Sequence, residues 1–171
     1  LAHMIGFRLD EDLRAAMNKH AASLQQSVLP RRREEILKLL RLKDPSLPFL
    51  EAYDLGILQY LSPKLHAVME DPQSAETFTS YLRHFHDFPV DKTNAVELFG
   101  FLVLAYVRST LLPDPLTVTR PRELQENEVL LQLMRDELGM FKFEQGLITR
   151  ALHMQSVLAK RAEFERKGER R

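Results

Sequence analysis

The sequence predicts an all-α protein: an irregular domain of seven or eight helices, with no sheet-based catalytic head. Apolar residues recur at helical spacing in successive segments, and no segment shows the alternation of apolar and polar residues that is typical of a strand. Proline and glycine separate these segments at intervals that suit short helices. With 171 residues, 44% of them hydrophobic and 28% charged, the chain is long enough to bury a substantial core as one domain.

Four helical segments are predicted in the first 70 residues. Pro30 suits a first helical position because its missing N–H costs nothing there. Glu34 and Glu35 fall in the first turn and Arg41 and Lys43 in the last, the order of charges that a helix dipole favours. Gly56 suits a left-handed C-cap, and Ser62 followed by Pro63 suits a helix start. The four segments are residues 10–24, 30–43, 46–55 and 64–69.

An aromatic stripe follows on the next predicted helix, for which Ser74 is the expected N-cap. Such a stripe can stack on nucleic-acid bases, but at the i, i+3, i+4, i+7 spacing of a helix it indicates core. The stripe consists of Phe78, Tyr81, Leu82 and Phe85.

Residues 98–107 are apolar on all sides and predict a central core helix. Asn94 is its expected cap, with Glu97 three residues later as in a capping box. Gly100 is expected to let a neighbouring helix approach closely. The run is only ten residues long, too short to span a bilayer, so no membrane partner is predicted.

The C-terminal third begins with a proline-rich extended loop over residues 112–122, after which a helical pattern resumes over residues 123–138. Gly139 is a plausible C-cap. The last helix is expected to begin near Phe143, and past Leu158 the basic end of the chain is expected to leave the body and fray. The apolar stripe of this helix consists of Leu147, Ala151, Met154 and Leu158.

Charge is balanced overall but unevenly distributed. Residues 8–43 hold nine Lys and Arg against five Asp and Glu, a net charge of +4; residues 150–171 hold seven against three, again +4. Residues 44–149 hold eight against sixteen, a net charge of −8. Basic ends around an acidic middle suggest an anionic partner, although a basic tail can equally serve solubility. The absence of cysteine excludes disulfides and thiol chemistry and is compatible with a cytoplasmic location.

Three motifs occur in order over the first 70 residues. Residues 2–11 read alanine, two residues, isoleucine-glycine-phenylalanine and then acidic residues; residues 31–40 combine an arginine run with Glu-Ile-Leu-Lys-Leu-Leu; residues 55–65 read Leu-Gly-Ile-Leu through Leu-Ser-Pro-Lys-Leu. Their order and spacing resemble the C-terminal neck-and-body region of bacterial class II nucleotidyltransferases. This family comprises the poly(A) polymerases and the CCA-adding enzymes of tRNA.

The resemblance implies an RNA-binding part of a poly(A)-polymerase-like, template-independent nucleotidyltransferase. It would position an RNA 3′ end, single-stranded or in a tRNA, for ATP-dependent nucleotide addition by a catalytic head. The chain lacks the family's glycine-serine motif before paired carboxylates, so we expect it to be inactive alone, with ATP and Mg²⁺ bound only by the missing head. The basic end favours poly(A) polymerase over the alternative, a CCA-adding body. The implied organisation is an RNA-binding-like neck over residues 1–70, a helical body over 71–158 and a basic tail over 159–171.

The candidate RNA-binding residues lie on and just after the 30–43 helix. At 100° per residue, Arg31, Lys38 and Arg41 fall within roughly 80° of one another, opposite the apolar stripe. Such a face can contact phosphates, or it can simply be solvated, since two glutamates share it. The phosphate interpretation predicts that alanine at residues 31–33 flattens the salt dependence of RNA binding by up to about 0.7 per lost contact. The six candidates are Arg31, Arg32, Arg33, Lys38, Arg41 and Lys43.

Two other classes of function stay open. The first, which the resemblance also implies, is a helical protein-interaction module that docks an RNA-decay partner such as an RNA helicase. The second is a helical regulator unrelated to the family. Capture of partners at high salt separates apolar docking from phosphate contacts.

His84, His86 and Asp87 form the only metal-like cluster, but residues two apart on a helix do not share a face, so no metal site is predicted.

Overall fold

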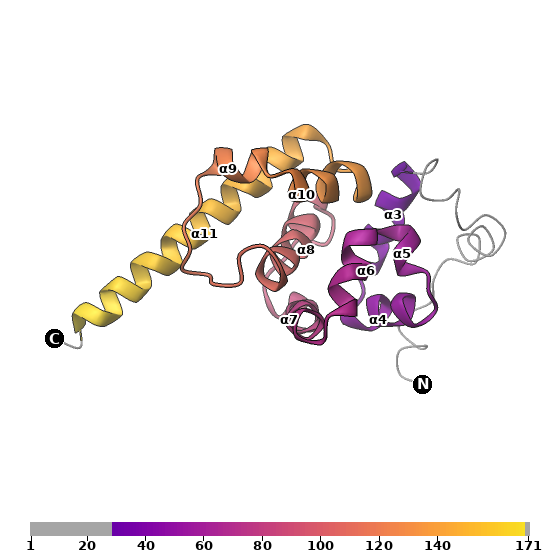
Figure 1. Cartoon of the computed structure of the whole chain (residues 1–171), viewed down its shortest axis with the longest axis horizontal. Coiled ribbons are helices and arrows are strands. Elements are labelled where there is room, and N and C mark those ends of the chain that lie inside the picture. The colour runs from indigo at the N-terminus through magenta and orange to yellow at the C-terminus, as the bar shows by residue number, and fades with distance from the viewer. Residues whose placement is uncertain (1–28, 170–171) are drawn as a thin grey trace.

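The structure, a computed structural model, describes residues 29–169, and every regular element in this part of the chain is helical (Figure 1). The all-α prediction is confirmed, while the helix expected over residues 10–24 lies outside the described residues. The α-helices are α3 Leu29–Leu40, α4 Ser46–Asp54, α5 Leu58–Leu61, α6 Pro63–Glu70, α7 Pro72–Arg83, α8 Ala95–Ser109, α9 Pro121–Glu126, α10 Glu128–Leu131 and α11 Lys142–Glu169, with a 3₁₀ turn at Phe85–Asp87 and a π-helical turn at Gln132–Glu137.

Helix α8 is the centre of the core, as its composition predicts. It packs against α3, α6, α7 and α11, and eight of its fifteen residues are buried. Three of the four residues in the predicted stripe of α7 and the following turn are completely buried, namely Phe78, Leu82 and Phe85, while Tyr81 is half-buried. A methyl group added at Gly100 would lie 3.7 Å from Ile148 Cγ1 of α11, an ordinary contact. Helix α11 therefore packs on α8 at this position, at a distance that would also accommodate alanine.

Side-chain caps set the starts of α6, α7 and α8. Ser62 Oγ accepts the Leu65 N–H at 3.2 Å at the start of α6, as predicted. Helix α7 begins earlier than predicted, because Asp71 rather than Ser74 is its cap and its carboxylate accepts the Ser74 N–H at 3.0 Å. Asn94 caps α8 by accepting two backbone N–H groups.

Two glycines adopt the left-handed backbone that ends a helix, as their positions predict. Gly56 follows α4 with φ +73°, and Gly139 follows the π-helical turn with φ +65°. At Gly139 the neighbours are close: an added Cβ would lie 3.2 Å from Leu29 O and 3.3 Å from Arg33 Cβ. The backbone at Gly139 therefore lies against the first turn of α3.

The C-terminal third differs from the prediction in two places. Residues 123–138 are not one helix, because Asn127 adopts extended backbone and caps a new turn by accepting the Leu130 N–H. Helix α11 does not fray after Leu158 but continues to Glu169 and extends beyond the rest of the domain (Figure 1). Ion pairs one turn apart, such as Arg161–Glu165 at 3.6 Å, support this outer part. The predicted boundary between body and tail thus falls within a continuous helix.

Among the described residues, no helix combines the length and the apolar character needed to cross a lipid bilayer.

Candidate nucleic-acid interface

Helix α3 has one exposed face and one buried face, and the candidate residues are divided between them. Arg31, Lys38 and Arg41 are exposed, as their helical angles predict, and Lys43 is exposed just beyond the helix. Arg32 and Arg33 are buried, with 3% and 9% of their surface accessible. We call the four exposed residues the α3 basic face.

The buried side chain of Arg32 links separate segments of the domain. Its guanidinium donates to two backbone carbonyls, Leu61 O at 3.3 Å and Asp136 O at 3.2 Å. Burial lowers the pKa of Arg32, and the charge of nearby Glu137 opposes that effect. The side chain therefore links α3 to the end of α5 and to the π-helical turn, and it has no exposed cationic surface for RNA.

Arg33 forms a buried, bidentate ion pair. It donates to both carboxylate oxygens of Glu144, at 2.6 and 2.8 Å, and to Gly139 O at 3.1 Å. Glu144 is only 2% exposed, so the ion pair is shielded from water. The guanidinium also lies 5.1 Å from the ring centroid of Phe99 and 4.4 Å from that of Phe141, within cation–π range.

The pKa values of this pair follow from its contacts. The hydrogen bonds to Glu144 raise the pKa of Arg33, against the effect of burial. Burial alone would raise the pKa of Glu144, but hydrogen bonds from Arg33 and the Phe141 N–H, with the charge of the arginine, hold it below the usual value. Both partners are therefore charged at neutral pH, and the pair joins α3 to the start of α11.

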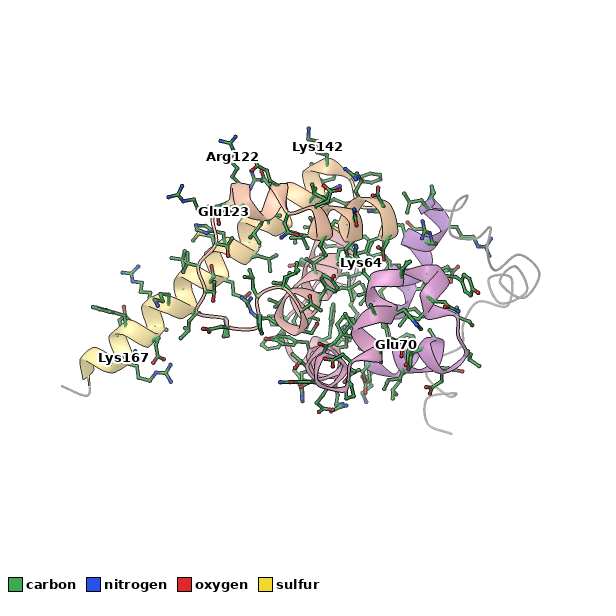
Figure 2. The ribbon with its side chains drawn as sticks, in the orientation of Figure 1. Lys64, Glu70, Arg122, Glu123, Lys142 and Lys167 are labelled. Atoms are coloured by element: carbon green, nitrogen blue, oxygen red, sulfur yellow. The ribbon has the colours of Figure 1, made fainter. Side chains whose placement is uncertain are left out.

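A third polar link joins the same parts of the chain. The buried Glu137 carboxylate accepts the Ser62 hydroxyl at 2.5 Å and the Lys64 N–H at 3.0 Å. Lys64 lies on the first turn of α6 and is labelled in Figure 2. Together with the two buried arginines, this contact fixes residues 29–65 on the segment 136–144.

The prediction that Arg32 and Arg33 contact RNA is therefore corrected. Three consecutive helical residues cover 200° of the helix surface, so they cannot all share one face. Arg32 and Arg33 point to the same side as Ile36 and Leu40, which are buried. That angular test needs only the sequence, and it separates Arg31 from its two neighbours.

The exposed cations are spread along the whole of α3. Lys38 Nζ lies 3.3 Å from Glu35 Oε1, and Arg41 Nε donates to Lys92 O at 2.9 Å. The second contact brings the exposed Lys92 beside the C-terminal end of α3. At 1.5 Å per residue, Arg31 and Arg41 lie about 15 Å apart along the helix. A nucleic-acid backbone laid along this face would therefore meet several positive charges in succession.

The histidine cluster separates in the structure. His84 Nδ1 lies 2.8 Å from Asp87 Oδ2 on the surface, whereas His86 Nε2 lies 2.9 Å from Leu40 O. The two imidazoles thus serve different local contacts. Within residues 29–169, no group of three or more His, Asp or Glu side chains is arranged to hold a metal ion.

Sequence reasoning missed two exposed apolar features. The rings of Phe141 and Phe143 are exposed at the start of α11, on either side of Lys142, which projects outward in Figure 2. The apolar stripe on α11 predicts the helix correctly but not its buried face. Ile148, Thr149, Leu152 and Ser156 face the core, whereas the stripe itself, made of Leu147, Ala151, Met154 and Leu158, is exposed.

Beside this stripe lies an open groove between α8 and α11 with a volume of about 410 Å³. Its lining includes Phe101, Leu104, Leu147 and Ala151. A second hollow, between α7 and α8, adjoins it and shares Phe101 and Leu104 in its lining. The groove and this hollow lie on parts of the chain well separated in sequence from α3.

Comparison with known proteins identifies one family. Residues 6–69 match the family model described as "Probable RNA and SrmB- binding site of polymerase A". Comparisons with curated proteins and with solved structures gave no match. The matched segment includes α3 and most of α6, and so carries the α3 basic face, the buried Arg32 and Arg33, and Ser62. The resemblance drawn from the sequence is thereby confirmed for residues 6–69, which match the model of an RNA-binding region of the poly(A) polymerase type.

Proposed function

We propose that this chain is the RNA-binding part of a poly(A)-polymerase-like nucleotidyltransferase, and that it holds an RNA 3′ end for ATP-dependent nucleotide addition by a catalytic head. The observation that carries the proposal is the exposed basic face of α3 inside the segment that matches the family model. Arg31, Lys38, Arg41 and Lys43 supply phosphate contacts that do not depend on base sequence. A CCA-adding body would use such contacts equally well, so the face alone leaves the RNA class open.

The buried polar contacts give α3 a defined position for this task. Arg32 and Arg33 tie the helix to the segment 136–144, so its exposed cations are presented on a fixed support. Pre-ordered side-chain supports reduce the entropy lost on binding. In this proposal ATP and Mg²⁺ are bound by the head, and the residues of this chain bind and orient RNA.

Glutamine at Arg41 and Lys43 should weaken binding of single-stranded RNA, measured by fluorescence anisotropy at low salt. Each lost phosphate contact lowers the affinity because fewer counterions are released. The matched control places glutamine at Arg122 on α9 and at Arg150 on α11. These two residues are also exposed and carry the same total charge as Arg41 and Lys43. Equal weakening by the two double variants would show that RNA binding follows net charge and not the α3 basic face.

A second candidate function is docking of a partner protein on the exposed stripe of α11 and its groove. The proposed occupant is an RNA helicase of the SrmB type, since the family description includes SrmB binding. The matched residues 6–69 do not include α11, so this surface would be an addition to the family segment. Contiguous exposed apolar surface of this kind typically marks an interaction site.

Binding of a purified SrmB-type helicase at about 1 M salt should separate the two functions, because the Debye length is then only about 3 Å. Apolar docking on α11 should persist, and glutamine at Leu147, Met154 and Leu158 should abolish it. A complex that dissociates at high salt and ignores these substitutions would exclude the stripe as the docking surface.

A further inference from the structure

Two phenylalanine rings lie exposed side by side where α11 begins. Phe141 and Phe143 are 55% and 65% accessible, their ring centroids are 6.1 Å apart, and their planes are inclined by only 21°. Single exposed apolar residues are ordinary, but paired parallel rings present flat π surface to solvent. Lys142 lies between them in the sequence and projects from the same end of the helix (Figure 2). We call residues 141–143 the aromatic platform.

The platform is supported from the inside of the domain. The guanidinium of Arg33 lies 4.4 Å from the ring centroid of Phe141 and is itself held by both carboxylate oxygens of Glu144. The Phe141 N–H donates to Glu144 Oε1 at 2.8 Å, which fixes the backbone under the ring. A surface ordered in this way before binding loses little conformational entropy when a ligand stacks on it.

The platform lies beside the buried side of the first turn of α3. The backbone at Gly139 lies against the first turn of α3, as the 3.2 Å distance from its added Cβ to Leu29 O shows. Arg31 is exposed on that same turn, and Lys142 is exposed on the platform. Lys142 is therefore the cation nearest in the sequence to both aromatic rings.

We propose that the aromatic platform stacks unpaired bases of single-stranded RNA, with Phe141 and Phe143 as the stacking surfaces and Lys142 as a phosphate contact. This inference rests on the proposed RNA-binding function and extends the interface beyond residues 6–69. Flat aromatic surface interleaved with cations suits nucleobases joined by phosphates. Stacking does not read bases through hydrogen bonds, but purines should bind better than pyrimidines because their stacking faces are larger.

The test replaces both phenylalanines by leucine, which keeps them apolar but removes the π faces. Binding of a fluorescent oligoadenylate should weaken by about tenfold or more, in line with the stacking contribution per base. Binding of an oligouridylate of equal length should weaken less, so the preference for adenine should fall. The F141Y/F143Y variant retains stacking surfaces and should restore both the affinity and the preference. An abasic RNA strand of equal length should bind the wild-type and F141L/F143L chains equally.

Each outcome decides between the two levels of the proposal. Unchanged oligoadenylate binding by F141L/F143L, with weakened binding by R41Q/K43Q, would overturn the platform and leave the proposed function in place. Equal losses on abasic and adenine strands would also overturn it, because the phenylalanines would then act only through the fold. No RNA binding by the wild-type chain would overturn both proposals.

Discussion

Replacing Glu144 by alanine is expected to lower the free energy of unfolding by about 3–5 kcal/mol, the cost of leaving a buried charge without its partner. Arg33 would lose both carboxylate contacts, and the Phe141 N–H would lose its acceptor. Chemical denaturation of the wild-type and variant chains, followed by circular dichroism, measures the difference.

The matched control is Glu126→Ala, which removes another arginine–glutamate pair. Glu126 Oε1 lies 2.9 Å from Arg122 Nε, but both side chains are largely exposed, so stability should change little. The double replacement Arg33→Met with Glu144→Leu should recover much of the stability, because an apolar pair leaves no unpaired charge. If Glu144→Ala costs no more than Glu126→Ala, the pair does not fasten α3 to α11.

The all-helical class and the central helix follow from the sequence because they depend on apolar spacing. Residues 98–107 have no polar side, so their only stable place is inside the domain. The caps at Ser62 and Asn94 could be predicted because a capping side chain acts on N–H groups two or three residues away. At α7 the prediction named Ser74, but the cap is Asp71, which precedes Pro72.

The functional surface is harder to predict, because a side chain's exposure depends on segments distant in sequence. The burial of Arg33 requires Glu144, which lies 111 residues later, and no local pattern pairs them. The same limit applies to α11, where the partly polar side of the helix is buried and the apolar stripe is left outside. The arginine run could have been divided by helical angles, but its partners could not have been named.

Neutralising the whole α3 basic face is expected to have the largest effect on RNA binding. Four phosphate contacts contribute about 2.8 to the slope of log affinity against log salt on single-stranded RNA, at about 0.7 per contact. Raising the salt from about 50 to about 200 mM should then weaken the wild-type contribution roughly 50-fold. The R31Q/K38Q/R41Q/K43Q variant should lack this component, while its fold should persist because all four side chains are exposed.

The decisive measurement is the salt slope of single-stranded RNA binding for the wild-type chain and this fourfold variant, determined on the same oligonucleotide. If the exposed cations of α3 contact the RNA phosphates, the variant's slope should be smaller by about 2.8. Equal slopes for the two chains would contradict the assignment of RNA binding to the exposed face of α3.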